Sequence, residues 1–291
     1  MIITLENDKL KVKVSSFAGY LESIWDKEKN MEHYWQYDSA VWPRRTSVCF
    51  PICGNLTDDE YSYEGKKYTL PSHGFLRENE LAVVEQTPIK VVFEFRDTEE
   101  TRKVYPFAFQ YLITEELVDG SFVVTYTVKN TGDGPMYYTT GSHYTYAMPI
   151  AAGEKQGDYV YQFGGPQKAG KLFLEGGQIA GKTDDIFHGA DNISLDGLFE
   201  AGSTILDLAD ITPKKIAIKS LKSGAFTEVA FEGFDYCVLW AKPGESPFIC
   251  IEPWTGMLDQ KGHDKDITKK LGITKLGAGE SKTYTQTITV G

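Results

Sequence analysis

The chain of 291 residues has little cysteine, little arginine and no long apolar run, and each shortage excludes a class of protein. Cys49 and Cys53 lack the C-x2-C spacing of zinc sites, and no second cysteine pair lies near them. Lys and Arg total 30 against 41 acidic residues, so the net charge of −11 argues against a nucleic-acid or anionic-membrane partner. No segment reaches the roughly 18 uncharged apolar residues that a membrane-spanning helix requires.

A signal-peptide core is also missing from the N-terminal segment MIITLENDKLKVKV, which carries a charge every few residues. We therefore expect a cytoplasmic protein. Its four cysteines are then expected to be thiols that pack as small buried hydrophobic residues: Cys49, Cys53, Cys237 and Cys250.

Helical periodicity is nearly absent, and alternation of apolar and polar residues takes its place. Clusters of Gly, Asp, Asn and Pro separate the alternating runs, as turns between strands do. Short helical turns are expected near Asp185–His188 and Asp266–Leu271. Strands are predicted at residues 10–16, 89–96, 109–117, 121–130, 214–221, 226–233, 236–242, 247–254 and 282–290.

These strands predict an all-β protein, a large antiparallel β-sandwich of two packed sheets with few short helices. No linker or shift in composition divides the chain, so residues 1–291 are expected to form a single domain. Aromatic residues make up 13% of the chain, which is enough for a large core. The Gly-rich segment from Gly153 to Gly202 is weakly patterned and is expected to form long loops.

Two of the five histidines, His73 and His143, have neighbours typical of a ligand pocket. His73 lies in LPSHGFLR, where the next glycine permits close approach of the backbone, and His143 lies in TTGSHYTYAMP among aromatic residues. Both are expected at the floor of a pocket. The other three, His33, His188 and His263, lie in polar loop sequence, where exposure to solvent is expected.

Glu252 lies at the end of the apolar run FICIEPWTG, and carboxylates are rarely buried without a partner or a function. Pro253 is expected to stop strand pairing, and Trp254 to cover the carboxylate. Burial raises the pKa of such a group, which suits a general base working near neutral pH. The structural alternative is a glutamate at a strand end that pairs with an arginine.

Arginine occurs at five positions, three of which lie near the candidate pocket residues. Arg44 and Arg45 follow Trp42–Pro43, and Arg77 follows His73 by four residues. Adjacent arginines usually lie on a solvated face. A rigid pair beside a pocket would instead hold a sugar hydroxyl or a phosphate.

Four segments, in this order, resemble the aldose 1-epimerases, or galactose mutarotase-like proteins. They are FPICGNL (50–56), YSYEGKKYTLPSHGFLR (61–77), VKNTGDGPMYYTTGSHYTYAMP (128–149) and ICIEPWTG (249–256). The resemblance covers essentially the whole chain. It implies a large β-supersandwich with a sugar site on one concave face, and an isomerase that interconverts the α and β anomers of a free aldohexose.

The resemblance also implies roles for individual residues. In this family a histidine of the G-x-H segment is the general acid and a glutamate of the E-P-W segment is the general base, which match His143 and Glu252. A second histidine that contacts the substrate matches His73. A raised-pKa Glu252 and a largely protonated His143 would open the sugar ring and close it on the other face. No metal or organic cofactor is implied.

Further candidates for binding the sugar are Asn55, Arg77, Arg45 and Trp254, the last through its apolar face. The chain departs from the common family pattern at two places. Asn55 stands where many members have an arginine that contacts the substrate. Tyr144 follows the G-x-H histidine, where a small residue or proline is usual, and is expected to narrow the pocket. The substrate-binding aspartate of the family is not assigned to any residue of the 180–210 region.

Three alternatives remain open. A non-catalytic carbohydrate-binding protein on the same fold would need the aromatic residues but not the acid–base pair. A glycoside hydrolase normally needs two carboxylates facing one bond, and the matched segments supply one. A hexose-6-phosphate mutarotase would use Arg44, Arg45 and Arg77, although the net charge of −11 slightly favours a free aldose.

Overall fold

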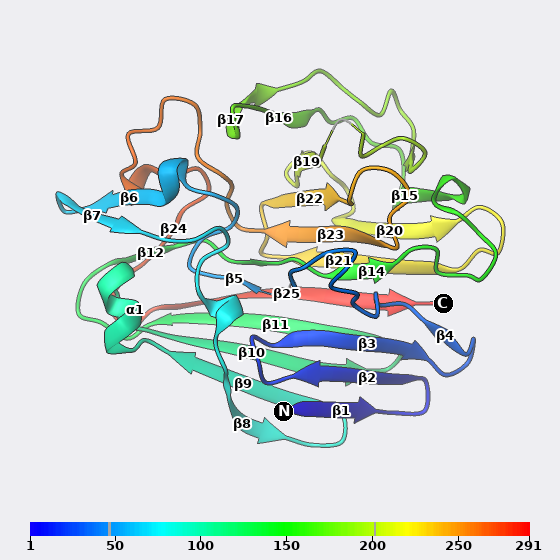
Figure 1. Cartoon of the computed structure of the whole chain (residues 1–291), viewed down its shortest axis with the longest axis horizontal. Helices are drawn as coiled ribbons and strands as arrows, with labels where there is room; N and C mark the ends of the chain where they lie inside the picture. Colours follow the sequence, from blue (N-terminus) through cyan, green and yellow to red (C-terminus); the bar gives the residue numbers. More distant parts are fainter. Residues whose placement is uncertain (46–47, 201) are drawn as a thin grey trace.

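The computed structural model describes residues 1–45, 48–200 and 202–291, and antiparallel strands dominate this part of the chain (Figure 1). Alternating sequence produces these strands because successive side chains of a strand point to opposite faces, and one face is buried. In β10 (Phe109–Val118) and β11 (Ser121–Asn130), buried side chains alternate with more exposed ones along the whole strand. The predicted all-β sandwich is confirmed.

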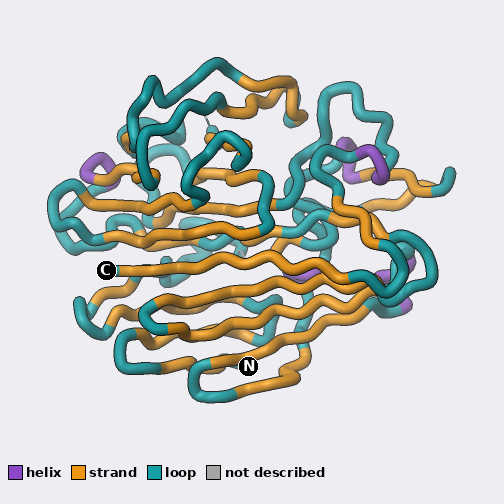
Figure 2. Tube along the Cα trace, turned by 180° about the vertical axis from the view of Figure 1, so that it is seen from behind, coloured by secondary structure: helices purple, strands orange, loops and turns teal. Residues whose placement is uncertain are grey.

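One layer of the sandwich is a long antiparallel sheet, which Figure 2 shows from behind as strands with loops at both ends. Within the described residues it has nine strands. In spatial order they are β18 (Asn192–Ser194), β15 (Tyr159–Phe163), β20 (Lys215–Ser220), β21 (Phe226–Glu232), β25 (Ser281–Val290), β11, β10, β9 (Lys90–Arg96) and β8 (Ala82–Gln86).

The other layer holds the strands that carry the candidate site. Its larger sheet has the order β17 (Gln178–Lys182), β16 (Lys171–Glu175), β19 (Thr204–Asp207), β22 (Tyr236–Trp240), β23 (Phe248–Trp254), β13 (Gly141–Ser142) and β5 (Val48–Cys49), and β14 (Thr145–Ala147) also pairs with β23. A smaller sheet has the order β1 (Ile2–Glu6), β2 (Leu10–Ser15), β3 (Tyr20–Asp26) and β4 (Met31–Glu32).

A shared core joins the two layers. The hydroxyl of Tyr161 in β15 donates to the backbone oxygen of Cys250 in β23 at 2.8 Å. The hydroxyl of Ser142 in β13 donates to Gln286 in β25 at 2.9 Å. These contacts fix the back of β13 and β23 against the long sheet, so their opposite faces are free to form a site.

Short elements complete the described structure. The two-stranded pairs are β6 (Glu60–Tyr63) with β7 (Lys66–Thr69), and β12 (Met136–Tyr138) with β24 (Thr274–Leu276). The helices are α1 (Glu99–Val104) and the 3-10 turns η1 (Thr57–Asp59), η2 (Leu76–Glu78), η3 (Gln156–Asp158) and η4 (Ile267–Lys269). None of the helices in the described ranges is both long and apolar enough to span a bilayer.

The prediction of a helical turn near Asp266–Leu271 is confirmed by η4, but the one near Asp185–His188 is wrong. There the Asp185 carboxylate accepts hydrogen bonds from the backbone N–H groups of Phe187 and His188, which stabilises a turn in place of a helix. Helix α1 was not predicted. It begins at a capping box, in which Thr98 and Thr101 each bond the backbone N–H of the other.

Loops and turns make up more than half of the described residues of the segment 153–202, as predicted; Ala201 lies outside the described residues. The segment also contains four strands that were not predicted, β15, β16, β17 and β18. Strands β16 and β17 form a hairpin at the edge of the sheet, where the burial of β16 shows little alternation, and a turn at Gly176–Gly177 joins them (Figure 1). A sparsely buried edge hairpin has no strict period-two signal, which explains why the sequence did not predict these two strands.

Candidate active site

Strand register brings His143 opposite Glu252. Gly141 of β13 pairs with Trp254 of β23, and Thr145 of β14 pairs with Cys250, so continuation of the same register places residue 143 opposite residue 252. The backbone pairing is interrupted between β13 and β14, at His143 and its neighbour. The His143 Nε2 atom lies 3.4 Å from Glu252 Oε2.

Pro253 does not stop strand β23, contrary to the prediction. It pairs in register with Cys237 of β22, and Trp254 pairs with Tyr236. On its other side, the register places Pro253 opposite Ser142, the last residue of β13, and the pairing of β13 with β23 is limited to Gly141 and Trp254, so the missing N–H of the proline is tolerated there. The strand therefore continues past Glu252 and fixes its side chain from both sides.

Burial shifts the pKa values of the two facing groups in opposite directions. The Glu252 side chain is 2% exposed, and its Oε2 makes no hydrogen bond in the described part of the chain. Burial, with a smaller effect from the Cys53 thiol, raises the pKa of Glu252 well above its usual value. Burial lowers the pKa of His143 to about 4, and the positive charge of Arg77 acts in the same direction.

The expected burial and raised pKa of Glu252 are therefore confirmed. The expectation of a largely protonated His143 is wrong for the cleft without sugar, because the imidazole is buried as well. The alternative of a Glu252–arginine pair is also wrong within the described residues, where the ion-pair partner of the carboxylate is His143. Both shifts favour the uncharged forms of the two side chains.

His73 lies beside this pair. Its ring centroid is 5.3 Å from that of His143 and 5.5 Å from that of Trp254. Its backbone has φ +63°, in the left-handed region that a non-glycine residue rarely adopts. Hydrogen bonds from His73 N to Gly54 O, 2.9 Å, and from Phe50 N to His73 O, 3.1 Å, hold this conformation. The loop of residues 50–54 therefore positions the imidazole.

These side chains line a cleft of about 200 Å³ that also includes Asn55. Pockets for drug-sized ligands are usually about 300–1,000 Å³, so this one suits a single sugar unit. The lining includes residues that the sequence analysis did not select, among them Trp42, Leu174, Val238, Trp240 and Leu258. Val238 pairs directly with Glu252, so alternation along β22 places Trp240 on the same face. That alternation was visible in the sequence, but nothing in it distinguishes the cleft face.

Tyr144 does not narrow this cleft, contrary to the prediction. Its side chain is 1% exposed and packs in the central core, where it accepts a hydrogen bond of 3.4 Å from the Tyr126 hydroxyl. Successive residues of an extended segment point to opposite sides, so Tyr144 faces inward because His143 faces the cleft.

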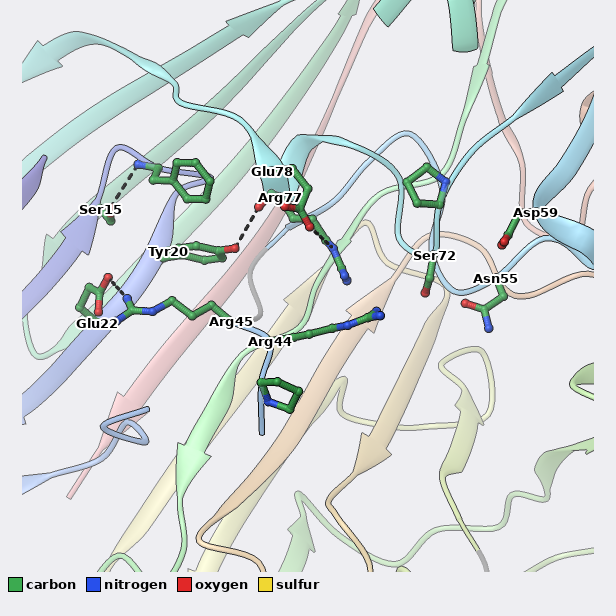
Figure 3. A pocket seen from close by; sticks show the side chains of 13 residues that line it. Ser15, Tyr20, Glu22, Arg44, Arg45, Asn55, Asp59, Ser72, Arg77 and Glu78 are labelled. Carbon is green, nitrogen blue, oxygen red and sulfur yellow. Dashed lines mark hydrogen bonds and ion pairs between the residues drawn. The ribbon is translucent and has the colours of Figure 1, made fainter. Parts of the chain in front are cut away.

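A second cavity, of about 920 Å³, adjoins the cleft at Asn55, which lines both. Arg44, Arg45 and Arg77 line it (Figure 3). Arg45 points away toward Glu22, with which it forms an ion pair, whereas the guanidinium groups of Arg44 and Arg77 point into the same space. Arg77 lies 3.6 Å from Glu78, and Arg44 forms no ion pair within the described residues.

Of the three histidines expected to be exposed, only His188 is. His33 is fully buried, with Nδ1 2.9 Å from the hydroxyl of Thr227. The His263 side chain is 8% exposed and lies 3.7 Å from the carboxylate of Asp259. Polar loop sequence did not reveal this burial because distant elements cover both rings.

Cys250 adds a thiol to the His143–Glu252 pair, with its Sγ 3.9 Å from His143 Nδ1. One donor atom from each of the three residues lies within 4.8 Å of the others. Nitrogen, sulfur and oxygen donors at such distances are ligands that zinc accepts. The same groups form the proton-transfer pair, so a metal and a proton would compete for Glu252.

The chain belongs to the aldose 1-epimerase family, whose sequence model matches residues 1–261. The fold and the sugar-sized cleft agree with that membership.

Similar proteins include a lactococcal relative and two solved structures. The plasmid-encoded protein LacX of Lactococcus lactis is 29% identical in an alignment of 286 positions that covers 95% of each chain. A galactose mutarotase related enzyme from Lactobacillus acidophilus has a similar structure, with a TM-score of 0.93, 28% identity, and coverage of 100% of this chain and 97% of that one. A galactose mutarotase-like protein from Lactobacillus casei has a TM-score of 0.91 and 29% identity, with both chains fully covered.

Proposed function

We propose that this protein is a mutarotase that interconverts the α and β anomers of a free aldohexose, with His143 and Glu252 as its proton-transfer pair. The observation that carries the proposal is the 3.4 Å contact between these side chains at a sugar-sized cleft. Opening the ring needs a base that takes the proton of the C1 hydroxyl and an acid that protonates the ring oxygen while the C1–O bond breaks. Rotation about C1–C2 and the reverse transfer then give the other anomer.

The protons that Glu252 takes up and His143 gives balance over this cycle. With Glu252 as base and His143 as acid, opening starts from a carboxylate and an imidazolium and ends with a protonated Glu252 and a neutral His143. Burial favours that final arrangement. The cleft therefore stabilises the proton arrangement of the open-chain state, which is the intermediate between the anomers.

Polarimetry of freshly dissolved α-glucose and α-galactose tests the proposal. His143→Asn and Glu252→Gln are each expected to lower kcat by roughly 10²–10⁴-fold, the usual contribution of a proton-transfer group. His188→Asn changes an exposed histidine and is the matched control. Interconversion at the buffer rate for every aldose tested, or full activity of either site variant, contradicts the proposal. Sugar binding without turnover would instead support a carbohydrate-binding protein.

A second candidate substrate, a hexose 6-phosphate, is favoured by the cavity that Arg44 and Arg77 line. Their guanidinium groups share one space that adjoins the cleft at Asn55 (Figure 3). Both positive charges act on the His73 ring, whose pKa is lowered first by burial and then by His143 and these arginines. The arginines therefore lie close enough to hold an anionic substituent of a sugar bound at the histidines.

Comparison of kcat/KM for glucose and glucose 6-phosphate decides between the two substrates. If the phosphate binds between the arginines, Arg44→Gln and Arg77→Gln should each lower kcat/KM for the phosphorylated sugar by about 10–100-fold, since hydrogen bonds to charged groups are worth about 1.5–3 kcal/mol. Glucose should be affected little. Arg96→Gln, at a largely exposed arginine paired with Glu94, is the control. Equal effects on both sugars would exclude an anion subsite.

A further inference from the structure

The contacts of His73 determine which of its two ring nitrogens carries a proton. The backbone N–H of Gly54 donates a hydrogen bond to His73 Nδ1 at 3.2 Å. A backbone N–H is a donor only, so Nδ1 must accept and has no hydrogen of its own. The neutral ring therefore carries its hydrogen on Nε2.

A second group lies at the same nitrogen. Cys49 Sγ is 3.1 Å from the same Nδ1 atom. Burial raises the pKa of the Cys49 thiol, so the thiol keeps its hydrogen and brings no negative charge that would favour a proton on Nδ1. A proton added at Nδ1 would face the N–H of Gly54 in a buried site, so the contact opposes an imidazolium at His73.

The opposite edge of the ring faces the cleft. His73 lines it together with His143 and Glu252, and Nε2 makes no hydrogen bond to the described residues. The contacts of Nδ1 with Gly54 and Cys49 hold the ring in place. The Nε2–H group is therefore the donor that the ring leaves free at the cleft.

We propose that Gly54 is a positioning residue, whose backbone N–H keeps the hydrogen of His73 on Nε2, so that the histidine to which the resemblance assigns a substrate contact meets the sugar as a neutral hydrogen-bond donor. The inference rests on the proposed mutarotation. As the C1 hydroxyl loses its proton, negative charge develops on oxygen, and a donor already in place stabilises it. His73 neither takes nor gives a proton in the cycle, so the proton count of the His143–Glu252 pair is unchanged.

The tautomer can be measured without any sugar. Long-range ¹H–¹⁵N correlation spectra of the full chain, with ¹⁵N-labelled histidine, distinguish the Nε2–H form, the Nδ1–H form and the imidazolium. The His73 signals are identified by their loss in His73→Gln. We expect the Nε2–H pattern, unchanged from about pH 5 to pH 8. An Nδ1–H pattern, or titration to the imidazolium within that range, would overturn the proposal whether or not the protein turns over sugars.

Two amide variants test the role in turnover. The side-chain NH₂ of glutamine extends to about the place of Nε2, whereas that of asparagine ends near Nδ1. We expect His73→Asn to lose about 10²–10³-fold in kcat/KM, as when one such donor is removed, and His73→Gln to recover most of that loss with an unchanged pH profile. If His73→Gln is as inactive as His143→Asn while both are folded, His73 transfers protons and the proposal is wrong.

Discussion

Two glutamates in this protein, Glu115 and Glu252, are buried without a matching cation among the described residues. Glu252 borders the cleft, so a bound sugar can supply the hydrogen bonds that the protein does not. Glu115 in β10 is fully buried in the core, and neither of its carboxyl oxygens has a partner there. Burial raises the pKa of Glu115 well above its usual value, so the group stays protonated in the folded protein.

This burial predicts that Glu115 destabilises the protein as pH rises. Because its pKa in the folded state lies above that in the unfolded chain, the folded state holds a proton that the unfolded chain releases above about pH 4.5. The contribution of Glu115 to the free energy of unfolding is therefore fully present below its pKa in the unfolded chain. It is lost as pH rises toward its pKa in the folded protein. We expect Glu115→Met to raise the free energy of unfolding by about 1–3 kcal/mol at pH 8 and by less at pH 5.

Urea unfolding at the two pH values measures this difference. Glu116→Gln is the control, since residue 116 is on the same strand but points to the opposite, more exposed face. A Glu115→Met variant that is less stable at both pH values, or equally affected at both, would show that the carboxyl has a partner.

At the scale of elements, the site depends on how closely two loops approach each other. The loop after β5 and the turn at His73–Gly74 meet in a parallel bridge between Phe50 and Gly74. A Cβ atom on Gly74 would lie 2.2 Å from the backbone oxygen of Phe50, and its φ is +74°. Both the conformation and the space therefore require glycine. The H-G pair in the sequence marks this approach.

Gly74→Ala is therefore expected to destabilise the protein by roughly 2–5 kcal/mol, the sum of left-handed strain and a clash with rigid backbone. Gly65→Ala is the matched control, because Gly65 has φ +76° but open space around the new methyl group. The Gly65→Ala variant should lose only about 1–2 kcal/mol of its free energy of unfolding. The free energies of unfolding of both variants, measured with denaturant, separate the energy of the clash from that of the left-handed strain. Equal losses would mean that the two loops can separate at no cost.

Alternation in the local sequence predicted the long strands well and the strands at the edge of the sheet poorly. Strand β11 begins and ends where the alternation does, at residues 121–130, because one face of the strand is buried in the core and the opposite face is more exposed. The hairpin of β16 and β17 lies at a sheet edge, so its side chains lack that constraint. The error at Pro253 has a similar origin. A proline normally ends pairing, but here the pairing with the facing strand β13 already stops next to Pro253, after Gly141 and Trp254.

At the scale of the whole molecule, the long sheet supports the strands of the site from behind, and the charge is distributed unevenly. The net charge is −11, yet three of the five arginines line one cavity beside the cleft. The positive charges of Arg44 and Arg77 lower the pKa of His73, and that of Arg77 also lowers the pKa of His143, although burial is the larger cause for both. The net charge of the chain therefore does not describe the charge around the catalytic candidates, and it is weak evidence against an anionic sugar.

The sequence by itself determined the class of fold and the family, and it selected candidate residues for the site. Alternation is a local property, and motifs such as G-S-H and E-P-W can be recognised without coordinates. Only the tertiary structure decided that His143 faces Glu252, that His73 accepts from Gly54, and that the arginines share a cavity. It also decided the protonation of the pair, because a pKa depends on burial, and burial is produced by segments far apart in the chain.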